Sequence, residues 1–158
     1  MQTSIILRSF TICVLIVISY AFDVALFKNM LHEQYNFYRS LHSAPPVHMN
    51  KGISATAERW SEILGTQSSR VCLHHSGRGG ENLFFYWSYR PATELELATM
   101  TAKAFYREIA LYDFSHPGYR KPAAHFTEMV WRAVSEIGIG LYMNVYKYVS
   151  LIMHLLSY

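Results

Sequence analysis

The stretch HFTEMVW, residues 125–131, brings a histidine, a hydroxyl group, a carboxylate and a tryptophan together within one short segment of the chain. If it forms a helix, His125 and Met129 share a face and Glu128 lies beside them. The positive end of the helix dipole favours a neutral His125 imidazole, which can bind a metal or accept a proton. The residues alone leave a second interpretation open, in which Met129 and Trp131 fill the core and His125 caps the helix or faces solvent.

Three further groups of residues precede this stretch. They are Asn36-x-x-Arg39-x-x-His42-x-x-Pro45, then His75-Ser76 with Gly80-Glu81-Asn82-Leu83, and then FYREI at 105–109. The series is closed by Gly138-Ile139-Gly140. In this order and spacing, the set resembles the CAP superfamily, which contains cysteine-rich secretory proteins, insect venom allergens and plant pathogenesis-related proteins. The resemblance covers about residues 26–142 and is strongest to the small, cysteine-poor branch of Golgi-associated plant pathogenesis-related proteins.

This resemblance implies both a fold and a site. The fold is of the α/β class, a three-layer α-β-α sandwich with a small antiparallel sheet between helices, in a single CAP/SCP domain over residues 22–158. The implied site is one cleft, and the residues at its matching positions are His75, Glu81, Glu108 and His125. The neighbouring positions that match the family motif are Asn82, Phe126, Thr127 and Trp131.

The residue types at these positions allow a limited chemistry. Two imidazoles can hold a zinc ion and leave positions open for water or a ligand, so His75 and His125 are the expected metal ligands. The glutamates can orient the imidazoles, complete the ligand shell or act as a general base on bound water. Without a metal, the same set is a pH-sensitive cluster of hydrogen bonds.

Two of these assignments stay open when the residues are considered without the family. Glu108 lies on an apolar helical stripe, where it either reaches solvent at the edge or points into a cleft. The adjacent His74 and His75 suit a solvated loop as well as a metal site, because a histidine pair lacks the rest of a coordination set.

An enzyme would need further groups. A hydrolase requires a nucleophile or an activated water, and a group that stabilises the oxyanion. Neither Ser76 nor Cys72 has the surroundings of a nucleophile, and the sequence contains no nucleophile elbow, zincin helix or phosphate loop. We therefore expect a non-catalytic binding module with no catalytic residues. The alternatives are a metal-dependent hydrolase or protease that uses the same four residues, and an extracellular interaction or effector protein in which they are structural.

The composition is that of one folded domain. The chain has 158 residues, of which 51% are hydrophobic and 16% charged, so it is not a disordered chain. The net charge is +3 and no basic run exceeds a pair, so no nucleic-acid partner is expected. The resemblance also implies that a lipid or sterol could bind in a hydrophobic groove formed by the aromatic run 83–87 and the loop 113–122.

Residues 1–21 have the pattern of a secretory signal peptide, with a basic start, an apolar run and small residues before Ala21. We expect cleavage after Ala21 and secretion of the protein. Any protein partner would then be extracellular. The alternative is an uncleaved anchor, which Asp23 disfavours because it interrupts a run already short for a membrane span. Cys13 would leave with the signal, and Cys72 would remain either as a buried, inert thiol or as the link in a covalent dimer.

Hydrophobic periodicity and chain breakers predict three helices, over residues 25–42, from about 50 or 54 to 64, and over 91–111. Strands are predicted at 136–142 and about 146–155, with a hairpin turn near 143–145 and a short strand near 70–73. Compared with the family, the usual segment after the second strand is missing. The C-terminal end is interpreted as incomplete relative to the family, either as a shortened natural end or through a faulty gene model.

Individual residues carry further expectations. Asn36 and Arg39 match family positions that hold the fold together, and Trp60 is interpreted as a core residue. The hydrophobic run 81–87 is interpreted as buried. Glu128 occupies a position that is usually neutral in the family. It adds a third carboxylate near the cleft, which could tighten cation binding, but we interpret it as a solvated charge on the helix surface.

Overall fold

The structure is a computed structural model, and it describes residues 21–67, 73–144 and 149–157. Several predictions from the sequence lie outside these residues: the signal peptide up to its last residue, Cys13, Cys72, most of the short strand near 70–73 and part of the hairpin turn near 143–145. Within the described part of the chain, none of the helices has both the length and the apolar character needed to cross a membrane.

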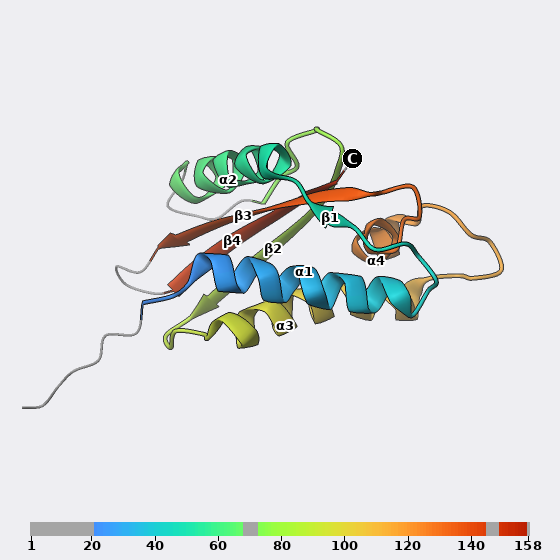
Figure 1. The fold of residues 1–158 in the computed structure, drawn as a ribbon, viewed down its shortest axis with the longest axis horizontal. Helices are drawn as coiled ribbons and strands as arrows, with labels where there is room; N and C mark the ends of the chain where they lie inside the picture. The colour runs from blue at the N-terminus through green and yellow to red at the C-terminus, as the bar shows by residue number, and fades with distance from the viewer. Residues whose placement is uncertain (1–20, 68–72, 145–148, 158) are drawn as a thin grey trace, which may run out of the picture.

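Three layers make up the fold, as Figure 1 shows. Helix α2 (Lys51–Thr66) covers one face of the sheet, where it packs on β3 (Glu136–Asn144) and β4 (Val149–Ser157). Helices α1 (Val24–Ser40) and α3 (Glu94–Tyr106) pack against each other on the opposite side. The short helix α4 (Ala124–Met129) contacts α3 and β2 (Gly80–Ser88). The predicted α-β-α sandwich is confirmed.

The sheet has the strand order β1-β3-β4-β2, and β4 pairs antiparallel with both β2 and β3. The two-residue edge strand β1 (His48–Met49) pairs parallel with β3, so the prediction of a wholly antiparallel sheet is corrected to a mixed one. The reason lies in Arg39, whose guanidinium binds carbonyls of the loops that lead into both strands. Because these two loops meet at one side chain, β1 and β3 enter the sheet from the same end.

Arg39 is fully buried, with 0% of its surface exposed. Its guanidinium donates to the carbonyl oxygens of Pro45, Met129, Trp131 and Val134 at 2.7–3.0 Å. Asn36 clamps the same connection one turn earlier, since its amide accepts from the Val47 N–H and donates to the Val47 carbonyl. Both residues therefore have the structural roles that the sequence predicts.

Direct contact between α2 and the sheet depends on two glycines of β3. A Cβ atom at Gly138 would collide with the backbone of Ile53, and one at Gly140 would collide with the backbone of Ala57. Hydrogen in place of a side chain therefore lets the helix backbone approach the strand closely. On the other face of the sheet, Ile137 and Ile139 are fully buried in the main core.

The long helix predicted over 91–111 is interrupted. It begins at Glu94 after a capping box formed by Thr93 and Glu96, and it continues as a 3-10 helix, η1 (Arg107–Leu111). Pro91 thus lies before the cap rather than in the first turn. The tighter winding of η1 means that the α-helical spacing used in the sequence does not apply to Glu108.

The run 81–87 is buried only at its start. Glu81, Asn82 and Leu83 are buried, whereas Phe85 and Trp87 are 37% and 46% exposed. By the two-residue period of the edge strand β2, Phe85 and Trp87 lie on the same face as Leu83, which contacts α2, whereas Phe84 and Tyr86 on the other face pack against the main core. Trp60 is only partly buried, beside the small cluster of Leu64 and Leu83, so its assignment to the main core is corrected.

Candidate functional site

His125 and Glu108 form the first of two histidine–glutamate pairs. Oε1 of Glu108 lies 2.7 Å from Nδ1 of His125, and Oε2 accepts the backbone N–H of the same residue at 2.8 Å. A longer bond of 3.4 Å links Oε2 to the N–H of Phe126. Since α4 has no side-chain cap of its own, the Glu108 carboxylate satisfies N–H groups that the start of this helix leaves open.

The ring of His125 is held on a second side by Phe105. The two rings stack with their centroids 5.1 Å apart and an interplanar angle of 20°. Asn82, which is buried at the start of β2, donates to the His125 carbonyl at 3.0 Å. Glu108 and Phe105 therefore orient the imidazole, while Asn82 holds the backbone that carries it.

The second pair is His75 and Glu81. Nδ1 of His75 lies 3.3 Å from Oε2 of Glu81. The Glu81 carboxylate also accepts the N–H of Ser76 at 2.7 Å, the N–H of Arg78 at 2.9 Å and the hydroxyl of Ser76. Its side chain is 2% exposed and that of His75 is 61% exposed. These backbone donors stabilise a buried carboxylate, so Glu81 organises the loop as well as facing the histidine.

Both histidines line one cleft of about 410 Å³. Its lining consists of His75, Gly77, Gly79, Gly80, Glu81, Tyr119, Ala124, His125 and Glu128. Glu108 is absent from this lining and acts on the cleft through the ring of His125. The structure therefore brings the four predicted residues (the tetrad His75, Glu81, Glu108 and His125) together at one cleft, three in its lining and Glu108 behind His125. Of the two alternatives for Glu108, the side chain faces a histidine rather than solvent at the edge of its helix.

The family-motif residues of α4, Phe126 and Thr127, are buried beneath the cleft residue His125 and pack α4 into the fold. Phe126 and Met129 are fully buried, and the Thr127 hydroxyl donates to the carbonyl of Ala123 at 2.7 Å. Trp131 differs, since it is 42% exposed and lines a cavity beside the cleft. The interpretation of Trp131 as core is therefore wrong, because the helix ends at Met129 and the chain has turned toward the surface.

Glu128 is not a solvated charge on an outer helix surface, as the sequence suggested. It is partly buried and lines the histidine cleft and the adjoining cavity. Its carboxylate lies against the backbone of Gly80, where a Cβ atom would collide with both Glu128 oxygens. The signal in the sequence was its position three residues after His125, which places it near the same helix face.

A metal is a further group that this fold suggests, and the donor set tests how well one would fit. Nδ1 of each histidine faces a glutamate, so Nε2 of His75 and His125 are the nitrogens that remain for a metal. No group of three or more histidine, cysteine, aspartate or glutamate side chains with metal-binding geometry occurs among the residues that the structure describes. Two imidazoles with outer carboxylates suit an open site that water or a ligand completes, rather than a closed structural zinc site.

A separate apolar pocket of about 510 Å³ lies between β2 and the end of α3. The residues that line it are Phe84, Met100, Lys103, Ala104, Tyr106 and Arg107. Sequence reasoning expected one groove from the run 83–87 and the loop 113–122. The two segments line different cavities instead, since Phe84 contributes here and Tyr119 contributes to the histidine cleft.

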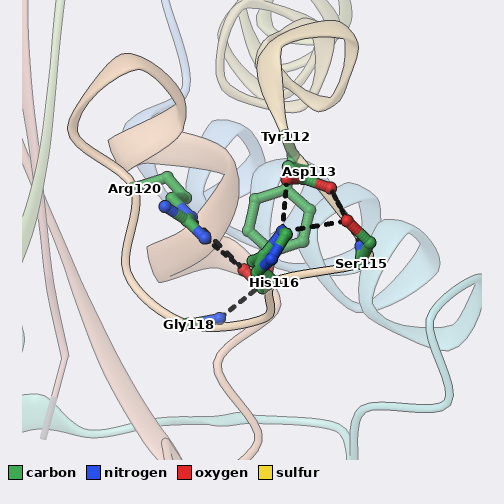
Figure 2. Close-up of polar contacts among 6 residues, drawn as sticks. All are labelled: Tyr112, Asp113, Ser115, His116, Gly118 and Arg120. Atoms are coloured by element: carbon green, nitrogen blue, oxygen red, sulfur yellow. Dashed lines mark hydrogen bonds and ion pairs between the residues drawn. The ribbon is translucent and has the colours of Figure 1, made fainter.

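The loop that carries Tyr119 is ordered by a polar network, drawn in Figure 2. The Asp113 carboxylate accepts from the backbone and hydroxyl of Ser115 and lies 2.8 Å from Nδ1 of His116. Hydrogen bonds from Ser115 are the main cause that lowers the pKa of Asp113 below its ordinary value. Ser115 and Asp113 both contact Nδ1 of His116, so the three residues do not have the geometry of a catalytic triad.

Together these features define the class of protein: a three-layer α-β-α sandwich with two histidine–glutamate pairs at one cleft. The sequence matches the CAP family, the Cysteine-rich secretory protein family, over residues 32–153, and the chain belongs to this family.

Similar proteins agree with this assignment. The chain is 36% identical over 118 residues to human Golgi-associated plant pathogenesis-related protein 1, a match that covers 72% of this chain and 71% of the human protein. The solved structure of BmVAL-1 has a TM-score of 0.61 at 20% identity, covering 84% of this chain and 77% of that one. The structure of NaASP2 with Zn²⁺ has a TM-score of 0.57 at 16% identity, covering 82% and 78%. These two structures share the fold with the chain.

Proposed function

We propose that the protein is a non-catalytic binding module that takes up an anionic amphiphile, a lipid with a negatively charged head group. The observation that carries this proposal is the apolar pocket between β2 and α3, which has Lys103 and Arg107 among its lining residues. Its volume of about 510 Å³ lies in the range of small-molecule sites. Phe84 and Met100 offer apolar contact to an acyl chain, while the two cations offer charge to the head group.

Displacement of a fluorescent fatty acid by palmitate from the purified protein tests this proposal. Ala104→Trp, which fills the pocket, should abolish binding. Lys103→Gln with Arg107→Gln should weaken palmitate binding by about ten-fold or more while an uncharged alcohol of the same chain length binds as before. Lys121→Gln is the control, since Lys121 is an exposed cation outside the pocket. Equal binding to parent and Ala104→Trp would contradict the proposal.

Sterol binding is a second form of the same proposal. A sterol lacks the negative head group, so its binding should depend on Phe84 and Met100 but not on the charges of Lys103 and Arg107. A labelled sterol tested on the same variants separates the two ligand classes. Loss of sterol binding in the double glutamine variant would show that Lys103 and Arg107 contribute to sterol binding, and would contradict this form of the proposal.

The histidine cleft supports a second candidate activity, the binding of a divalent metal. We propose His75 and His125 as the protein ligands, with Glu81 and Glu108 orienting their rings. When bound, a zinc ion would act as a Lewis acid at the open cleft. The support from relatives is that NaASP2 was solved with Zn²⁺. Calorimetric titration of zinc into the parent and into His75→Ala, His125→Ala tests it, with His48→Ala as a control for an exposed histidine elsewhere.

The geometry also bears on the alternative of a metal-dependent hydrolase or protease. A general base needs a carboxylate oxygen that can reach the attacking water. Both oxygens of Glu108 already contact His125, and those of Glu81 accept from the loop of Ser76 and Arg78. This engagement favours positioning roles for the glutamates. Zinc-dependent turnover that is lost in Glu81→Gln or Glu108→Gln, with zinc affinity retained, would reverse this assignment.

A third function, as an extracellular interaction or effector protein, predicts a partner whose binding survives His75→Ala and Ala104→Trp.

We further propose that the protein is secreted, with cleavage after Ala21. Amino-terminal sequencing of protein recovered from the medium of expressing cells tests this point. A non-reducing gel of the same material, beside Cys72→Ser, tests the proposed dimer through Cys72.

A further inference from the structure

A second cavity, of about 440 Å³, adjoins the histidine cleft. Its lining residues are Gly79, Gly80, Tyr119, Glu128, Trp131, Ala133 and Val134. Gly79, Gly80, Tyr119 and Glu128 line both cavities, so the two form adjoining parts of one surface depression. The part beyond Glu128 contains neither histidine of the tetrad, and its chemistry is therefore different.

The carboxylate of Glu128 lies against Gly80, and both residues line the two cavities. It occupies the space that a side chain on Gly80 would fill. Gly80 begins β2 and does not have a positive φ, and a side chain at this position would displace the end of the Glu128 side chain. A carboxylate is thus part of the lining of this cavity.

Two aromatic side chains line the same cavity and are open to solvent. Tyr119 is 63% exposed and Trp131 is 42% exposed. The backbone on both sides of Tyr119 is held, since the N–H of Gly118 donates to the Tyr112 hydroxyl at 3.0 Å (Figure 2) and the Arg120 carbonyl accepts from the N–H of Ala123 at 2.9 Å. The Trp131 carbonyl accepts from buried Arg39 at 3.0 Å. Their backbone positions are therefore set before any ligand arrives, which lowers the entropy cost of binding.

A carboxylate that lines the same cavity as exposed tyrosine and tryptophan side chains provides the groups that recognise organic cations. Aromatic faces attract ammonium groups, and most strongly when the ring is tryptophan. Ala133 and Val134 add apolar contact for alkyl groups on the nitrogen. We propose that Glu128, Tyr119 and Trp131 form a subsite for a substituted ammonium ion, distinct from the two histidines and from the pocket proposed for the anionic amphiphile.

Titration with choline, followed in two-dimensional amide and indole NMR spectra of the purified protein, tests this subsite. Choline should shift the Trp131 indole signal and the amide signals of Tyr119 and Glu128 saturably. Dimethylbutanol, the uncharged carbon analogue of choline, should bind with an affinity at least about ten-fold lower than that of choline. The double variant His75→Ala, His125→Ala should bind choline as the parent does, which separates this subsite from the metal proposal.

Variants identify the groups responsible. Glu128→Gln keeps the shape and removes the charge, and Gly80→Ala keeps the charge and displaces the carboxylate. Each should weaken choline binding by about ten-fold, as should Tyr119→Ala, a change at an exposed loop position. Glu33→Gln, an exposed carboxylate of α1 outside the cavity, should have no effect. Equal binding of choline and its neutral analogue, absence of saturable shifts, or full binding by a folded Glu128→Gln would overturn the proposal.

Discussion

Oε1 of Glu108 lies 2.7 Å from Nδ1 of His125, while Oε2 of the same carboxylate accepts the backbone N–H of His125 at 2.8 Å. One side chain thereby fixes both the ring and the start of the helix that carries it. The imidazole can then present Nε2 to the cleft in a constant orientation.

Glu108→Gln should therefore weaken zinc binding without unfolding the protein. The glutamine retains an oxygen for the N–H of His125 but replaces the oxygen that faces Nδ1 with an amide NH2, which no longer accepts a hydrogen bond from the ring. We expect zinc affinity to fall by about 10- to 100-fold in a calorimetric titration. Glu33→Gln is the matched control on α1. An unchanged zinc affinity in folded Glu108→Gln would show that the carboxylate does not tune this histidine.

Arg39→Met should cost at least about 3 kcal/mol of unfolding free energy, because it leaves several buried carbonyl groups without donors. The four carbonyl partners belong to both loops that enter the sheet, so β1 and β3 should lose their common entry point. Chemical denaturation measures the change. Arg132→Met removes an exposed arginine that donates to the Ser43 carbonyl, and it should cost about 0.5 kcal/mol or less. Similar losses in both variants would contradict the role assigned to Arg39.

Gly140→Ala should destabilise the protein by about 1–3 kcal/mol or more, because the new Cβ atom would displace α2 from the sheet. The collision is with the backbone of Ala57, which cannot move aside as a flexible side chain can. Gly52→Ala, in the first turn of α2, meets only the Asn50 side chain at 3.3 Å and serves as the comparison. Thermal unfolding of the two variants should give a clearly lower midpoint for Gly140→Ala; equal midpoints would refute the close packing.

His42 should make the folded state less stable in acid. Burial lowers the pKa of His42 below its ordinary value of 6.5, beside the Tyr106 hydroxyl and the Phe126 ring. The unfolded chain therefore binds a proton at higher pH than the folded chain does. The stabilising contribution of the neutral His42 is fully present above the pKa of the unfolded chain. It is lost as the pH falls from that value through the lower pKa of the folded chain.

Denaturation of the parent and of His42→Gln at about pH 7.5 and about pH 5 measures this contribution. The parent should lose more stability between the two conditions than the variant does, since glutamine does not titrate. His48→Gln, at an exposed histidine on β1, is the control. An equal pH dependence in all three proteins would assign the acid sensitivity to other groups.

Most of the fold was predictable because its signals are local. The apolar stripe of α1 and the prolines after it predict a helix over 25–42, and the structure has Val24–Ser40. The strand predicted at 136–142 is found at Glu136–Asn144, and the one predicted at about 146–155 at Val149–Ser157. In each case the hydrophobic period of the segment and its chain breakers contain the information.

The features that the sequence did not predict depend on contacts between distant segments. The parallel entry of β1 follows from Arg39, whose partners lie up to 95 residues away. The change from α-helix to 3-10 helix after Tyr106 accompanies the hydrogen bond between Glu108 and the backbone of α4. The placement of Glu128 depends on the missing side chain of Gly80. No periodic pattern reports such pairs, and only the family resemblance brought His75, Glu81, Glu108 and His125 together.

The pocket between β2 and α3 carries the central proposal, and a crystal structure of the protein with palmitate tests it most directly. We predict that the acyl chain lies between Phe84 and Met100 and that its carboxylate contacts Lys103 or Arg107. Palmitate bound elsewhere on the protein, with this pocket occupied only by water, would contradict the proposed function.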